Sequence, residues 1–352
     1  MRFRAILREA SRGVLSGTAR TLAFLCITVV LIGGLVSVDL VAIRQLIREA
    51  QDFRESGAAT LIVTAPGRVD GARCRGLAEV VGVEASGAIR PRADTFVVEV
   101  LPSAPLLAFD VTPGFGALLG VSDTVGGALV SRDVAETLVI APGKSVAVRG
   151  GALDVGAVYS YPDDGRRPGL AWAALLESVD TAPFDECWLR AWPPSEVTRS
   201  LLLATVDPGD DAPDIIQLNT TRGAEFDGPE QYAGRVTAPA PLAAAVLAFA
   251  VGVAAVRLRR LEWASNLHAG ARRRDLVSVA LLEAASWLIP ALVVVIGAGV
   301  FLVAGEDASD HASLVVGIFR IASLALVGAV IGVLIGMHGV REHHLVRYVK
   351  DR

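Results

Sequence analysis

Four long apolar stretches constrain this chain more than any other feature of its sequence. They cover residues 21–43, 236–256, 276–304 and 314–337. At 1.5 Å per residue, a helix of about 20 residues crosses the roughly 30 Å hydrocarbon core of a bilayer. Each stretch is therefore predicted to form a transmembrane helix. The 53% hydrophobic composition agrees with a membrane protein and excludes a soluble cytoplasmic enzyme.

The first apolar stretch is predicted to stay in the mature protein as a transmembrane helix. Its apolar run is longer than the core of a secretory signal, and no small-x-small cleavage pattern follows it before Val38. We therefore do not interpret residues 21–43 as a signal peptide.

The long segment 44–235 separates the first and second apolar stretches and has the composition of a folded domain. Strand-like and helix-like patterns occur in mixed order and are separated by Pro-Gly and Asp-Gly turns, which indicates an α+β domain. Strands are predicted at 60–64, 95–100, 145–148 and 214–218, and helices at 72–80, 132–138 and 195–204.

Basic residues gather beside the apolar stretches in three segments. The N-terminal segment 1–20, the loop 257–275 and the tail 338–352 together hold 15 basic and five acidic residues. The positive-inside rule places these segments, and both termini, in the cytoplasm, so that 44–235 and the short loop 305–313 lie outside. We expect an α-helical membrane protein of a bacterial inner or plasma membrane. It has four transmembrane helices and a large extracytoplasmic α+β domain between the first and second.

Charge and motif content argue against several other functions. The net charge of −4 gives no basic excess for nucleic acid. All five histidines lie outside residues 44–235, so the outer domain has no histidine for a zinc cage or a nucleophile–histidine pair. Paired carboxylates are left as the only candidate chemistry there. The Gly143-Lys144-Ser145 sequence is not a phosphate loop, because Leu138 stands where the motif needs glycine. We expect no enzyme activity, no metal site and no cofactor bound by this chain.

Two of the three cysteines, Cys74 and Cys187, fall in the outer domain, whereas Cys26 lies in the first apolar stretch. The outer domain is expected in an oxidising compartment and holds an even number of cysteines. Both points favour a Cys74–Cys187 disulfide. Two buried free thiols are the alternative.

Three charged residues fall inside the predicted transmembrane segments. Asp39 and Arg320 are both expected in the outer leaflet, where an isolated charge is costly, so we predict that they pair. The alternative is that each side chain reaches the interface by itself. Glu283 lies in the inner leaflet and is predicted to pair with an arginine from 257–260.

The layout of one span, a large outer domain and three further spans resembles the MacB/FtsX-like family of ABC transporter permeases. The local match is best over residues 257–263, 269–274 and 281–284, which resemble the family's basic helix, Gly-Ala turn and Leu-Leu-Glu-Ala span entry. Residues 130–159 resemble part of the family's outer domain. One departure is the tail, which runs from His338 to Arg352 without the Pro-Ala-x-x-Ala segment common in the family.

The resemblance implies a partner, a cytoplasmic ATPase dimer that binds ATP and magnesium and pushes on the loop 257–275. One face of a helix in this loop is formed by Leu258, Leu261, Ala264 and Leu267. Trp263 is a candidate interfacial anchor. An ordinary basic loop without a partner is the alternative. The residues that we expect to couple to the ATPase are Arg259, Arg260, Leu261, Trp263, Leu267, Arg272 and Arg273.

Two functions fit such a protein. The first is a permease that exports or extrudes a hydrophobic or peptide-like substrate, and four helices then require a second permease chain, identical or different. The second is a non-transporting FtsX-like protein that activates an extracellular partner, such as a cell-wall hydrolase. A membrane-anchored binding module without an ATPase is a third alternative.

Overall fold

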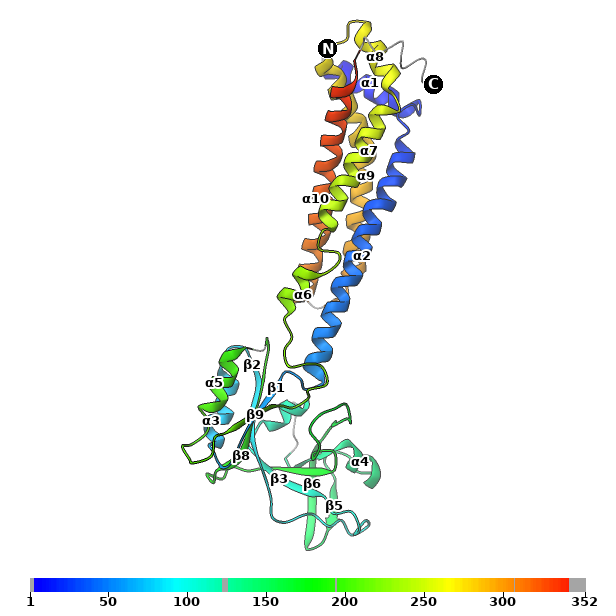
Figure 1. Cartoon of the computed structure of the whole chain (residues 1–352). Helices are drawn as coiled ribbons and strands as arrows, with labels where there is room; N and C mark the ends of the chain where they lie inside the picture. The colour runs from blue at the N-terminus through cyan, green and yellow to red at the C-terminus, as the bar shows by residue number, and fades with distance from the viewer. Residues whose placement is uncertain (1–2, 122–125, 194, 307, 342–352) are drawn as a thin grey trace. The chain divides into compact units, whose positions relative to one another are not determined.

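The computed structural model describes residues 3–121, 126–193, 195–306 and 308–341. The chain forms two compact units. The helical unit comprises residues Met1–Arg48 and Gly228–Arg352, and the mixed unit comprises Glu49–Asp227. Both are drawn in Figure 1.

Four helices are long and apolar enough to cross a membrane, as the apolar stretches predict. They are α2 (Thr21–Glu55), α7 (Ala240–Arg257), α9 (Arg273–Val303) and α10 (Ala308–Gly339). α2 extends past the predicted end at residue 43, because the polar sequence that follows has no Gly or Pro until Gly57. Its last two turns, from Glu49, belong to the mixed unit.

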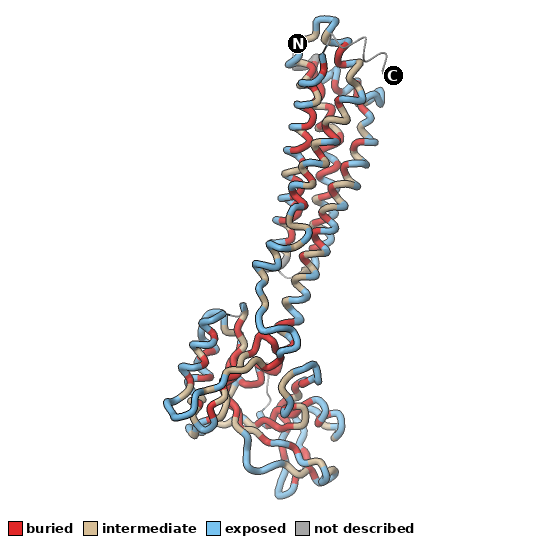
Figure 2. Tube along the Cα trace, viewed as in Figure 1, coloured by how far each residue is buried: buried red, intermediate tan, exposed pale blue. Residues whose placement is uncertain are grey.

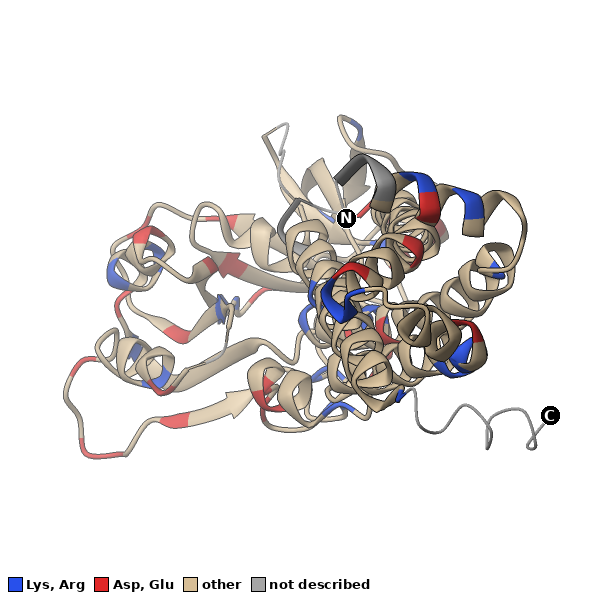
Figure 3. Cartoon of the chain, turned by 90° about the horizontal axis from the view of Figure 1, so that it is seen from above, with Lys and Arg blue, Asp and Glu red and all other residues tan. Residues whose placement is uncertain are grey.

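Three short helices complete the helical unit, namely α1 (Phe3–Leu15), α6 (Gly228–Gly234) and α8 (Arg260–His268). Along each long helix, buried positions alternate with exposed ones (Figure 2), and the buried side chains of all four meet in one core. Figure 3 looks onto the end that holds α1 and α8, where basic and acidic residues lie close together.

The contact between α7 and α10 brings the two backbones close together. A methyl group added at Gly332 would lie 2.2 Å from the Phe249 carbonyl oxygen, and one added at Gly328 would lie 2.1 Å from that of Ala245. Glycine at four-residue spacing on α10 therefore lets the two helices meet without side chains between them.

The mixed unit is built on one nine-stranded sheet of order β5-β6-β4-β7-β3-β2-β8-β1-β9. The pairs β3/β7 and β4/β6 are parallel and the others are antiparallel. The strands are β1 (Thr60–Val69), β2 (Val83–Pro91), β3 (Leu107–Val111), β4 (Ala128–Ser131), β5 (Ser145–Val148), β6 (Gly151–Tyr159), β7 (Ala173–Glu177), β8 (Phe184–Ala191) and β9 (Asp214–Gln217).

Alternate residues of the central strands supply two separate cores. On β8, Trp188 packs in one core while Cys187 and Leu189 pack in another, because successive side chains of a strand point to opposite faces. The mixed unit also contains short α-helices and two 3-10 helices. These elements are α3 (Gly71–Gly76), η1 (Leu77–Glu79), η2 (Phe115–Leu119), α4 (Arg132–Leu138) and α5 (Glu196–Leu203).

The α+β prediction agrees with this unit, but the strand predicted at 95–100 is wrong. Phe96 pairs with Leu106 and Val98 pairs with Val148, so this segment forms single bridges to two different neighbours. No continuous ladder forms, because the segment passes from one neighbour to the other within three residues. The helix predicted at 72–80 is also shorter, since α3 ends at Gly76 and continues as η1.

Candidate functional site

The candidate site lies at one end of the helical unit, where α8 joins α7 to α9. α7 ends at Arg257, α8 occupies residues 260–268, and a turn through Gly270 leads into α9 at Arg273. Gly270 has a φ of +89°, a conformation that side chains disfavour. The short helix is thus held between two helices that are long enough to span a membrane.

A buried ion pair joins the start of α8 to α9. Arg259 donates through Nη1 to Glu283 Oε2 and through Nε to Glu262 Oε2, the latter at 2.8 Å. Its guanidinium also lies over the Trp263 ring, 4.9 Å from the centroid. The prediction that Glu283 pairs with an arginine from 257–260 is confirmed. Removing one partner would leave the other charge buried without compensation.

Trp263 is not the interfacial anchor that the sequence suggested. The residue is only 3% exposed and packs with Ala264 in the core of the helical unit. The predicted apolar face of the loop is therefore divided, because Ala264 points inward while Leu258, which precedes α8, is exposed. Arg259 lies over the ring and the helical core packs against it, and together they bury the side chain.

The other residues predicted to contact an ATPase lie in different environments. Arg273 is exposed and donates to the carbonyls of Met337 and His338, so it caps the end of α10. Arg272 is exposed at the start of α9, and Arg260, Leu261 and Leu267 are half-buried.

A groove of 530 Å³ lies beside the ion pair, between α1, α8 and α9. α1 closes one side because Ile6, Ala10 and Gly13 are buried at helical spacing. A methyl group at Gly13 would lie 2.2 Å from Glu283 Oε1, so this glycine permits the close approach of α1 to α9. The groove is lined by Arg12 and Gly13 of α1, Leu261 and Asn266 of α8, and Leu276 and Glu283 of α9, among others.

The groove's α1 wall was not predicted, because residues 1–20 were interpreted only as a basic segment. The signal was present in the sequence. Apolar or small residues at positions 6, 10 and 13 follow the spacing of one helix face, with charged residues between them.

The second predicted pair, Asp39 with Arg320, is wrong. Asp39 Oδ1 instead accepts from Arg235 Nε at 3.2 Å, and both side chains are buried. Arg235 also lies over the Tyr232 ring, 3.9 Å from its centroid. Arg320 is exposed, and none of the ion pairs among the described residues involves it. Arg235 was overlooked because it lies just outside the apolar stretches.

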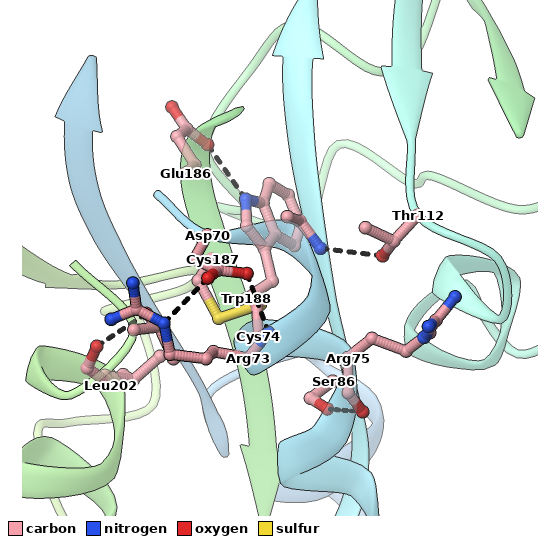
Figure 4. The surroundings of a disulfide bond; sticks show 12 residues. Asp70, Arg73, Cys74, Arg75, Ser86, Thr112, Glu186, Cys187, Trp188 and Leu202 are labelled. Carbon is pink, nitrogen blue, oxygen red and sulfur yellow. Dashed lines mark hydrogen bonds and ion pairs between the residues drawn. A yellow bond between two sulfur atoms is a disulfide. The ribbon is translucent and has the colours of Figure 1, made fainter. Parts of the chain in front are cut away.

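The predicted disulfide between Cys74 and Cys187 is present. It joins α3 to β8 with a Cα–Cα distance of 5.8 Å, and both residues are fully buried. Figure 4 shows that Asp70 and Arg73 flank the bond. Asp70 accepts from the backbone N–H groups of Ala72 and Arg73 at the start of α3, which fixes the helix that carries Cys74.

The mixed unit contains a groove of 700 Å³, lined by residues including Arg68, Asp70, Thr112 and Asp180. Within the part of the chain that the structure describes, no group of three or more His, Cys, Asp or Glu residues is placed to hold a metal ion.

No protein-family model matches the sequence, and no curated protein matches it. The solved structures that are similar to part of the chain include two transporter domains. The periplasmic region of MacB from Actinobacillus actinomycetemcomitans has 9% sequence identity and a TM-score of 0.34, covering 48% of this chain and 94% of that chain. The extracellular domain of the noncanonic ABC-type transporter YknZ from Gram-positive bacteria has 15% identity and a TM-score of 0.28, covering 40% of this chain and 88% of that chain.

Proposed function

We propose that this chain is the membrane-spanning permease subunit of an ABC transporter of the MacB/FtsX type. The observation that carries the proposal is α8, a short helix between two membrane-capable helices that a buried ion pair ties to α9. A partner that displaces α8 would also displace α9, because the pair would otherwise separate in a buried environment. The sequence resemblance over residues 257–284 supports the same assignment.

In this proposal the ATPase is a separate cytoplasmic dimer that binds ATP and magnesium. It contacts the exposed part of the loop, which includes Leu258 and Arg272. Motion passes from α8 into the helical unit and leaves it through α2. This helix runs without a break from Thr21 to Glu55 and is followed by β1 at Thr60, so a displacement of α2 acts directly on the sheet of the mixed unit.

The transported molecule is proposed to be hydrophobic or peptide-like, and the four helices would pair with those of a second permease chain to form its path. The mixed unit would lie outside the membrane and change shape with the ATPase cycle. A bacterial cell membrane with both termini in the cytoplasm is the arrangement that the distribution of basic residues supports.

Leu258→Asp tests the proposal, because this leucine is exposed and its replacement disturbs no packing in the chain. The full-length protein would be purified from its own membrane in mild detergent. We expect an ATPase subunit to purify with the wild-type chain and to be lost from the variant, since an aspartate would be buried in the contact. Val179→Asp, at an exposed apolar residue of the mixed unit, is the control and should retain the ATPase.

Two outcomes would contradict the proposal. One is a wild-type chain that purifies without any ATPase subunit under these conditions. The other is a Leu258→Asp variant that retains the ATPase and its turnover in full. The first result would favour a membrane-anchored protein that works without ATP, and the second would mean that the ATPase does not bind through Leu258.

A further inference from the structure

The indole N–H of Trp263 has no hydrogen-bond acceptor among the described residues, although its nitrogen is fully buried. Buried donors in folded proteins are nearly always satisfied by protein groups or by ordered water, because an unpaired N–H loses its bond to solvent without replacement. The indole nitrogen is a donor only, so its missing partner must be an acceptor.

A small cavity, partly open to its surroundings, adjoins this side chain. Its volume is 20 Å³, enough for one water molecule and too small for a larger ligand. The residues that line both this cavity and the α1–α8–α9 groove are Trp263, Arg259 and Glu283. The remaining lining consists of Trp287, which carries a second indole N–H, and of the apolar residues Ala19, Ala255, Val256, Ala280, Ala284 and Val333.

The polar groups around the cavity require a ligand that both accepts and donates. Trp263 offers an N–H, whereas the Glu283 carboxylate offers lone pairs beyond the one that Arg259 uses. A metal cation does not suit a site that contains an N–H donor and a guanidinium. A single water molecule has the right size and can serve both groups.

We propose that this cavity binds one structural water molecule, which accepts a hydrogen bond from Trp263 Nε1 and donates one to the Glu283 carboxylate. The water gives α8 a second attachment to α9, beside the Arg259–Glu283 ion pair. It also satisfies a donor that would otherwise be buried at a cost. The site follows from the burial and the cavity alone and does not depend on the proposed transport function.

Replacing Trp263 with 3-benzothienylalanine tests the site, because this amino acid keeps the shape of the indole but has sulfur in place of N–H. The full-length chain would be melted in lipid nanodiscs. A bound water predicts that Tm falls by roughly 2–4 °C, since a satisfied hydrogen bond is lost. An unchanged or raised Tm would overturn the proposal, because removing an unsatisfied donor relieves its cost.

The same replacement at Trp188 is the matched control. Trp188 Nε1 donates to Glu186 Oε2 at 2.8 Å, so its replacement must destabilise the mixed unit.

A second measurement uses ¹⁵N-labelled tryptophan, with the Trp263 indole signal assigned by its loss in Trp263→Phe. We expect cross-relaxation between this indole proton and a long-lived water. Its absence would overturn the proposal even if the replacement lowered Tm.

Discussion

Gly13 is the residue at which the contact between α1 and α9 is most sensitive to substitution. Gly13→Ala would place a methyl group 2.2 Å from Glu283 Oε1, so either α1 or the carboxylate must move. We expect a loss of about 1–3 kcal/mol, as for other overpacked sites, and faster hydrogen exchange in α1. Ser11→Ala, at an exposed position of the same helix, should leave exchange unchanged. Equal exchange in both variants would show that α1 does not pack against Glu283.

Ionisation of Tyr161 should lower the stability of the mixed unit at alkaline pH. Burial raises the pKa of Tyr161 to about 12 from its ordinary value of 10.0. Its stabilising effect is complete below pH 10 and is lost between pH 10 and 12, because the unfolded chain releases the proton first. Across this window the free energy of unfolding should fall by about 1.4 kcal/mol per pH unit for this residue.

Denaturant unfolding of the full-length chain, followed by tryptophan fluorescence at several pH values, measures this slope. Tyr161→Phe should reduce the slope by about one proton. Burial also raises the pKa of Tyr159, so part of the slope remains in the variant. Identical slopes in wild type and variant would contradict the assignment to Tyr161.

The Cys74–Cys187 bond closes a loop with a sequence separation of 113 residues. In the chain-entropy view such a cross-link stabilises by up to about 4–5 kcal/mol. We expect Cys187→Ser to lower the Tm of the mixed unit and to abolish a reductant-sensitive shift in electrophoretic mobility. Mass spectrometry that finds both thiols free in freshly isolated membranes would contradict this expectation.

Pairing of individual charges was only partly predictable from the sequence. Glu283 is predicted to pair with an arginine from 257–260, because both belong to the same end of neighbouring spans, and the structure shows that this arginine is Arg259. Asp39 was matched with the wrong arginine, because the candidates were restricted to charges inside the apolar stretches and Arg235 lies beside one. Hydropathy predicts how deep in the membrane a residue lies, but it does not predict which face of the helix the residue occupies.

Among the helices, the α7–α10 contact depends most on glycine. Gly332→Ala would place a methyl group 2.2 Å from a backbone carbonyl of α7, which cannot turn away as a side chain can. We expect a loss of about 1–3 kcal/mol, measured as a lower Tm of the full chain in detergent. Gly297→Ala on α9 is the control, because nothing lies within 4 Å of that position. A Gly332→Ala variant as stable as the control would contradict the close contact.

Elements defined by local composition were the most predictable. The apolar stretches and the helix at 132–138 depend on residues close in sequence, and both appear in the structure. The strand predicted at 95–100 failed because a strand needs a continuous neighbour, which local sequence does not specify. α1 was missed because its buried face is short and lies among arginines.

For the molecule as a whole, the sequence indicated both units, but it did not indicate the groove beside Glu283. A groove depends on which distant segments come together, here α1, α8 and α9. The burial of Trp263 also depends on distant segments, because the ring is covered by Arg259 and by the helical core together.

Hydrogen exchange of the mixed unit, measured in the purified complex with and without a non-hydrolysable ATP analogue, tests the coupling most directly. We expect that nucleotide changes the exchange rates in the mixed unit of the wild type. We expect no such change in Glu283→Gln, which weakens the link from α8 to α9 while leaving the exposed surface of α8 for the ATPase. A nucleotide response of equal size in Glu283→Gln, with the ATPase still bound, would contradict the proposed coupling.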